Sequence, residues 1–189
     1  MTEFRQRLLD ALEASIADEG YAKATVADIV RRARTSRRTF YQHFTSRDEC
    51  FVALLTEANA DQIRQIHDAV DPAAPWRQQV RQAIEAWIGS AERRPALMLS
   101  WIRDVPALGS SARGLQRDAL EHFVDLVGAL AETEQFRSAG IGPVPRRRII
   151  MLLGGLRELT AITVEEGGRM SDVTEEAVDA SIALVGRGR

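Results

Sequence analysis

The sequence predicts an all-α protein, with a small N-terminal domain and a larger C-terminal domain. Apolar residues recur at helical spacing along most of the 189 residues, and helix-start motifs follow one another closely before residue 50. No alternating run is long enough for a β-sheet. We expect about nine helices, arranged as a three-helix domain over residues 1–47 and a helical domain over residues 48–189.

Three short helices are predicted in the N-terminal domain. The first spans about residues 2 to 19, because apolar side chains recur there at Phe4, Leu8, Leu12 and Ile16. Thr25 and Asp28 form a helix-start motif, in which the hydroxyl accepts a backbone N–H and the acid favours the positive helix end. This second helix ends near Arg32. Ser36 is a good N-cap for a third helix that ends near His43.

Longer amphipathic helices are predicted from residue 46 onward. Ser46 and Glu49 repeat the helix-start motif and open a helix that carries apolar residues on one face as far as Ile66. Segments rich in proline or glycine then interrupt the pattern, at residues 71–75, 140–145 and 167–168. The further helices are predicted at about residues 76–94, 95–104, 111–136, 146–166 and 171–186.

Positive charge is concentrated in one segment of an otherwise acidic chain. The formal net charge is −2, yet residues 21–47 carry seven lysines and arginines against one acid. Such local concentration is the electrostatic mark of a nucleic-acid surface, but a solvated arginine-rich face has the same composition. Charge alone therefore leaves both interpretations open.

A short helix, a tight turn and a second short helix form the helix-turn-helix arrangement, whose second helix enters the major groove of DNA. Arginines there can fork onto guanine or phosphate, and hydroxyl, Tyr and His side chains can reach phosphate oxygens. Phe40 and Phe44 are predicted to anchor this helix in the core. The predicted DNA-binding residues are Thr25, Arg34, Thr35, Ser36, Arg37, Arg38, Thr39, Tyr41, His43 and Arg47.

The segment 33–49, ARTSRRTFYQHFTSRDE, closely resembles the DNA-binding signature of TetR-family transcriptional regulators. Gly20 and Tyr21, and the run from Thr25 to Ile29, agree with that signature upstream. The resemblance implies a homodimeric, mostly repressive regulator, whose helical C-terminal domain binds a small molecule and pairs through its last two helices. The expected partners are therefore a double-stranded DNA operator, a small-molecule effector and a second copy of the chain.

The sequence departs from the family pattern at four positions. Arg34, Thr35 and Arg38 stand where family members commonly carry Gly, Val and Gly, and Arg47 stands in place of a lysine. If the backbone at Arg34 has a positive φ, an arginine there costs about 1 kcal/mol. Arg38 places a long side chain where close approach to DNA is usual, which predicts an unusual target sequence.

The C-terminal domain carries aromatic and methionine side chains that suit either a ligand cavity between the fifth to eighth helices or an ordinary core. For each of them alone, core is the stronger alternative. Three polar residues on or beside apolar helix faces suit either ligand contacts or internal hydrogen bonds. The candidate ligand-binding residues are Asn59, Trp87, Met98, Trp101, His122, Phe123, Met151 and Glu158. No motif identifies the ligand.

Two features of the last helices favour a partner surface. Gly154 and Gly155 interrupt a helical pattern at a cost of up to ~1 kcal/mol each relative to alanine, which indicates close approach at a dimer interface or a kink. The final helix carries an apolar and small-residue stripe that a monomer would leave partly exposed. The stripe consists of Val173, Ala177, Val178, Ser181, Leu184 and Val185.

Patterns of catalysis and metal binding are missing, so we expect neither an enzyme nor a cofactor. The three histidines are scattered, and Cys50 is the only cysteine. The longest run of apolar residues and glycine, at 149–156, is far shorter than the ~20 residues that cross a bilayer. Five acids in the first twenty residues do not suit a secretory signal. We expect a cytoplasmic protein.

Two alternative functions stay open beside the regulator. A helical adaptor would use the basic segment to bind an acidic protein partner, without sequence-specific DNA binding. A small-molecule-binding helical enzyme is the weaker alternative, because the chain holds no nucleophile elbow, phosphate-binding glycine loop or zinc-protease motif.

Overall fold

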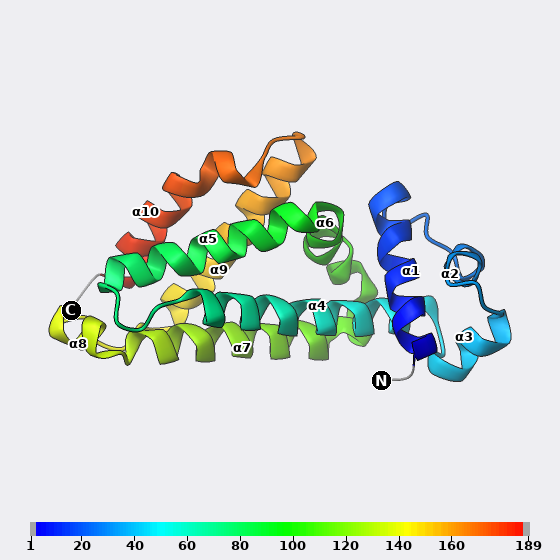
Figure 1. Cartoon of the computed structure of the whole chain (residues 1–189), viewed down its shortest axis with the longest axis horizontal. Helices are drawn as coiled ribbons and strands as arrows, with labels where there is room; N and C mark the ends of the chain where they lie inside the picture. The colour runs from blue at the N-terminus through cyan, green and yellow to red at the C-terminus, as the bar shows by residue number, and fades with distance from the viewer. Residues whose placement is uncertain (1–2, 187–189) are drawn as a thin grey trace. The chain divides into compact units, whose positions relative to one another are not determined.

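The structure of the protein is a computed structural model that describes residues 3–186, and every regular element in that range is helical. Ten α-helices and two 3-10 helices, η1 (Val105–Ala112) and η2 (Met170–Val173), follow one another along the described chain (Figure 1). None of the helices in this range has the length and apolar content of a membrane span. The α-helices are α1 (Glu3–Glu19), α2 (Val26–Arg32), α3 (Arg37–His43), α4 (Arg47–Ala69), α5 (Trp76–Arg93), α6 (Pro95–Arg103), α7 (Arg113–Ala131), α8 (Glu134–Ser138), α9 (Arg146–Glu165) and α10 (Thr174–Val185). The all-α prediction is confirmed.

The chain divides into two compact units that do not follow its order along the sequence. The first unit combines Met1–Ala58 with Arg94–Gln116, and the second combines Asn59–Arg93 with Arg117–Arg189. Helices α4 and α7 therefore contribute residues to both units. The predicted boundary after residue 47 separates a DNA-binding domain from a ligand-binding domain, and this functional division stays a prediction.

The core of the first unit forms around α1. Helix α1 packs against α2, α3 and α6. Its Leu8, Leu12 and Ile16 are buried together with Phe40 of α3 and Phe51 of α4. Burying a side chain of this size contributes roughly 1.5–3 kcal/mol relative to leaving it exposed. Short helices such as α2 and α3 are marginal in isolation, so this apolar core stabilises them.

In the second unit, α10 packs against both α5 and α9, and Figure 1 shows α5 and α10 side by side. The contact is close at one end, because a Cβ on Gly186 would lie 2.5 Å from the Trp76 ring. A bidentate ion pair joins Arg81 of α5 to Glu175 of α10, with N–O distances of 2.7 and 2.8 Å. Exposed ion pairs contribute little to stability, so the apolar contacts hold this unit together.

One predicted helix is wrong in its extent. The apolar spacing predicts a single helix over residues 111–136, but the structure contains η1, then α7, and then the separate α8. Thr133 has an extended backbone (φ −63°, ψ 155°) and stands at the N-cap position of α8. Side-chain spacing does not reveal so short a break, and α8 brings the number of α-helices to ten.

Most of the apolar stripe predicted on the last helix is buried within the chain, and only Val173 and Leu184 are partly exposed. Val178 and Ser181 are fully buried within the chain, and Ala177 and Val185 are nearly so. The exposed positions of α10 instead include Glu175, Glu176 and Asp179. Exposed apolar side chains lie on α9, at Ile150, Met151 and Ile162.

Candidate nucleic-acid interface and ligand cavity

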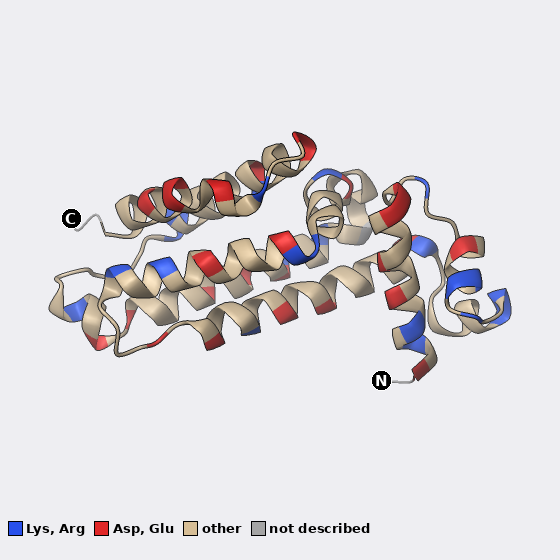
Figure 2. Cartoon of the chain, turned by 45° about the horizontal axis from the view of Figure 1, so that its top comes forward, with Lys and Arg blue, Asp and Glu red and all other residues tan. Residues whose placement is uncertain are grey.

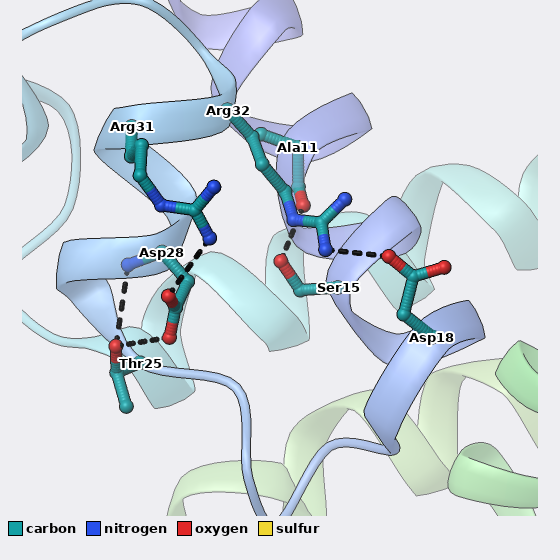
Figure 3. Close-up of polar contacts among 7 residues, drawn as sticks. All are labelled: Ala11, Ser15, Asp18, Thr25, Asp28, Arg31 and Arg32. Carbon is teal, nitrogen blue, oxygen red and sulfur yellow. Dashed lines mark hydrogen bonds and ion pairs between the residues drawn. The ribbon is translucent and has the colours of Figure 1, made fainter.

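Hydroxyl caps fix the starts of α2 and α3. Thr25 accepts the backbone N–H of Asp28 at 3.2 Å, and Ser36 accepts that of Thr39 at 3.1 Å. The Thr25 hydroxyl also donates to the Asp28 carboxylate at 2.5 Å, and Arg31 donates to the same carboxylate at 3.1 Å (Figure 3). These hydrogen bonds hold the pKa of Asp28 below its ordinary value. An ionised acid in the first turn favours the positive end of α2.

The turn between α2 and α3 contains a left-handed residue, Arg34, with φ 49°. It is the one non-glycine residue with positive φ in the described range. The arginine at this position is therefore expected to carry the steric cost predicted from the sequence for a positive φ. The N–H of Thr35 donates to the carbonyl of Val30 at 2.9 Å and closes the end of α2. Arg7 of α1 donates to the carbonyls of both Ala33 and Arg34, the second at 3.2 Å. The sequence did not predict this role of Arg7.

Arg34→Gly is expected to raise the free energy of unfolding by about 1 kcal/mol, because glycine adopts a positive φ without the steric cost of a Cβ. Urea unfolding followed by circular dichroism measures the change. Arg38→Gly is the matched control, because the same exchange inside helix α3 should lower stability by about 1 kcal/mol. Destabilisation by both exchanges would contradict the strain at Arg34.

Helix α3 buries one face and exposes the other. Phe40 is fully buried and Phe44 nearly so, with ring centroids 5.7 Å apart. Tyr41 follows Phe40 directly but is 57% exposed. Arg37 and Arg38 are also exposed, and Thr39 and His43 are partly exposed. The aromatic anchors therefore turn the cationic and hydroxyl side chains outward.

Three of the seven basic residues in segment 21–47 are engaged within the first unit. Arg31 pairs with Asp28 and Arg32 with Asp18 of α1, as Figure 3 shows. Arg47 is the third. The other four are exposed, and their side chains form no ion pair or hydrogen bond with another residue in the range 3–186. These four are Lys23, Arg34, Arg37 and Arg38. Figure 2 shows the basic residues in blue on α2, the turn and α3.

Arg47 has a structural role that the sequence did not predict. Its guanidinium lies 4.3 Å from the centroid of the Tyr21 ring and donates to the carbonyl of Ala24 at 2.8 Å. The Tyr21 hydroxyl donates to Asp48 at 2.5 Å. Burial, followed by this hydrogen bond, raises the pKa of Tyr21 above its ordinary value, so the phenol stays a donor. The predicted phosphate contact of Arg47 stays a prediction.

A cavity of about 70 Å³ lies within the second unit, bounded by α5, α7, α8, α9, α10 and the end of α4. Trp87 and Phe123 form part of its wall, with ring centroids 5.1 Å apart. The polar groups of the wall are satisfied internally, because the Trp87 indole donates to Thr160 and the Ser181 hydroxyl donates to a backbone carbonyl. Ligand sites usually measure about 300–1,000 Å³, so a large ligand requires side chains to move.

Residues 8–54 match the family model described as bacterial regulatory proteins, tetR family. This segment of the chain belongs to the TetR family. The chain is 32% identical over 90 residues to the HTH-type transcriptional activator FasR of Mycolicibacterium smegmatis. That match spans 48% of this chain and only 41% of FasR, or about two fifths of the relative's length.

Solved structures share the TetR fold over the whole chain. The fatty acid degradation regulator FadR from Bacillus halodurans has a TM-score of 0.80 and 16% identity, over 100% of this chain and 99% of that one. FadR from Bacillus subtilis, solved in complex with stearoyl-CoA, also has a TM-score of 0.80 and 16% identity, over 97% and 99% of the two chains. Identity this low shows a common fold and no more.

The TetR-family signature positions gather in one part of the structure. All but one of the predicted DNA-binding residues lie at the start of α2, in the turn or at the start and outer face of α3, with side chains at least partly exposed. They are Thr25, Arg34, Thr35, Ser36, Arg37, Arg38, Thr39, Tyr41 and His43. Their contact with DNA stays a prediction.

The predicted ligand-binding residues do not gather in the same way. Only Trp87 and Phe123 are among the described residues that line the cavity. Met98 and Trp101 belong to the first unit, and Met151 and Glu158 are exposed on α9. Asn59 is buried 3.5 Å from the exposed His122, outside the wall. Apolar spacing predicted the helix over residues 146–166 but did not tell which of its side chains are covered.

Proposed function

We propose that this TetR-family protein is a homodimeric DNA-binding transcriptional regulator, a repressor that a small-molecule ligand releases from a near-palindromic operator. The observation that carries the proposal is the helix α3, whose aromatic side is buried while Arg37 and Arg38 point outward without internal partners among the described residues. The major groove admits an α-helix, and an arginine can bind guanine O6 and N7 together. Ser36, Thr39 and Tyr41 lie beside these arginines and suit phosphate.

The exposed face of α9 supports a second copy of the chain. Met151 is 57% exposed, and Ile150 and Ile162 are exposed as well. Gly154 and Gly155 lie between them, and a Cβ on either glycine would have no neighbouring atom within 4 Å. The glycines therefore leave room for a helix of a partner to approach closely. A two-fold dimer would bring two α3 helices to half-sites about 34 Å apart, or a multiple of that distance.

The cavity supports release by a ligand, and so does the likeness to FadR, which is solved with stearoyl-CoA in the Bacillus subtilis protein. Helix α4 is continuous from Arg47 in the first unit to Ile66 at the cavity wall. A ligand that shifts this helix would change the separation of the two α3 helices, which lowers affinity for the operator. Ligand and DNA affinities would then be coupled reciprocally.

Selection of genomic fragments on the purified protein tests DNA binding. We expect retention of a defined near-palindromic sequence that survives increasing salt better than random DNA does. Retention without sequence preference, together with capture of an acidic protein, would favour the adaptor instead. A promoter reporter that carries the selected site then tests repression, because loss of the protein should raise expression. Lower expression would make it an activator, as FasR is named.

Arg37→Ala is expected to weaken binding to the selected operator by about 1–3 kcal/mol, because one forked contact to a base is lost. Fluorescence anisotropy with operator and random duplexes at two salt concentrations measures the loss. Arg117→Ala, which removes an exposed arginine of α7, is the control and should change neither affinity. An equal loss on both duplexes would assign Arg37 to phosphate, and no loss on either would remove it from the interface.

A further inference from the structure

We infer that Gln62 is the polar anchor of the effector site and that its amide donates to a carbonyl or carboxylate oxygen of an acyl compound whose hydrocarbon chain enters the apolar cavity. The inference rests on the proposed function, because it assigns the chemistry of the ligand that this function requires. It is carried by an unsatisfied buried donor and by the place of that donor on α4, one helical turn before Ile66 of the cavity wall.

The Gln62 side chain is buried without satisfying its hydrogen-bonding capacity. The residue is 5% exposed, and its Nε2 has no hydrogen-bond partner among the described residues. Gln79 in the same unit shows the usual situation, because the amide of this fully buried residue donates to the carbonyls of Pro72 and Ala74 at 3.1 and 2.8 Å. Burying a donor without a hydrogen-bond partner costs about 1–3 kcal/mol of stability. A bound ligand that accepts a hydrogen bond from this donor would remove that cost.

On helix α4, Gln62 lies between the polar Asn59 and the apolar Ile66. Ile66, one helical turn further along and on the same face, lines the cavity. Asn59 lies about one turn earlier on that face, and its Nδ2 is 3.5 Å from Nδ1 of His122 on α7. Helix α7 shows a similar order, because the exposed His122 directly precedes Phe123 in the cavity wall. Both helices thus carry polar side chains within about one turn of a residue of the cavity wall.

The chemistry of these groups selects an amphipathic ligand with an acceptor at one end. The amide nitrogen of Gln62 can only donate, so it needs an oxygen such as that of a carboxylate, an ester or a thioester. Among the described residues that line the cavity, Ser181 is the only hydroxyl residue and none is charged. A chain without polar groups along its length suits this wall, and a cationic head group has no acid there to pair with.

Calorimetric titration of the full chain without DNA tests the inference, with dodecanoate and dodecylammonium below their aggregation concentrations as probes. Wild type is expected to bind dodecanoate more tightly than dodecylammonium. Gln62→Leu should weaken dodecanoate binding by about tenfold or more, because a hydrogen bond to the ligand oxygen is lost. Gln78→Leu, which removes an exposed amide of α5, is the matched control and should bind like wild type.

Gln62→Glu separates an anchoring role from a merely structural one. At a pH high enough to ionise the buried carboxyl, this variant keeps the shape of the side chain but only accepts hydrogen bonds, so it should reverse the preference and bind dodecylammonium more tightly than dodecanoate. The thermal unfolding midpoint of Gln62→Leu should not fall, because the variant removes an unpaired buried donor. If Gln62→Leu fails to fold, the reversal in Gln62→Glu decides alone.

Two results would overturn the inference: wild type that does not bind dodecanoate, or Gln62 variants that bind both probes as wild type does. Operator binding is measured separately on the same preparations. A protein that binds its operator but not dodecanoate loses only this assignment of the ligand. A protein that binds dodecanoate but shows no selective DNA binding keeps the anchor and loses the proposed regulatory function.

Discussion

Phe40→Ala is expected to lower the free energy of unfolding by about 3–5 kcal/mol, because it removes a large side chain from a fully packed core and leaves a cavity. Phe40 is 0% exposed, and its ring contacts both Phe44 and Tyr41. Helix α3 has only seven residues, so its position depends on this contact with the core. Urea unfolding followed by circular dichroism measures the loss.

Tyr41→Ala is the matched control, because it changes the neighbouring aromatic residue on the exposed side of the same helix. It should alter stability by less than about 0.5 kcal/mol, as exposed substitutions usually do. Operator affinity should nevertheless fall, because the hydroxyl would be lost from the DNA-facing side. Similar losses of stability in the two variants would contradict the orientation of α3 on which the interface depends.

Met151→Asp is expected to raise the dissociation constant of the dimer by at least a thousandfold. Two-fold symmetry places two new carboxylates in one interface, and each unpaired charge buried there costs several kcal/mol. A thousandfold change corresponds to about 4 kcal/mol. Sedimentation equilibrium measures the association, and operator affinity should fall with it because a single half-site gives little binding.

Ala129→Asp is the control for this charge, because Ala129 is exposed on α7 and not on α9. It should leave the association unchanged. The variant Met151→Asp keeps the core of its unit, since Met151 is 57% exposed, so its fold is expected to persist. A wild-type protein that sediments as a monomer, or a Met151→Asp variant that stays dimeric, would remove α9 from the interface.

Short-range rules were enough to predict the helix-turn-helix segment. The caps at Thr25 and Ser36 act on backbone groups three residues away, and both appear in the structure as hydrogen bonds to those groups. The burial of Phe40 beside an exposed Tyr41 also follows from helical periodicity. These features depend on neighbours along the chain, which the sequence shows directly.

Contacts between distant segments could not be predicted in the same way. Arg7 reaches Arg34 across 27 residues, and Arg47 turns toward Tyr21 across 26. Met151 has the apolar side chain that a cavity wall requires, but it lies on the exposed side of α9. Tertiary contacts decide which side of an apolar helix is covered. Gln62 has an ordinary polar side chain in the sequence, and only burial shows that its amide lacks a partner.

Arg7 donates hydrogen bonds to the carbonyls of Ala33 and Arg34. Because of these bonds, the substitutions that position 7 tolerates depend on the residue at position 34. With an arginine at position 34, the left-handed turn depends on the guanidinium that holds it from α1. Once a glycine stands at position 34, the turn forms unaided, and position 7 becomes free to vary. The two sites are therefore epistatic, and the order in which they change decides whether the intermediate protein keeps a well-formed turn.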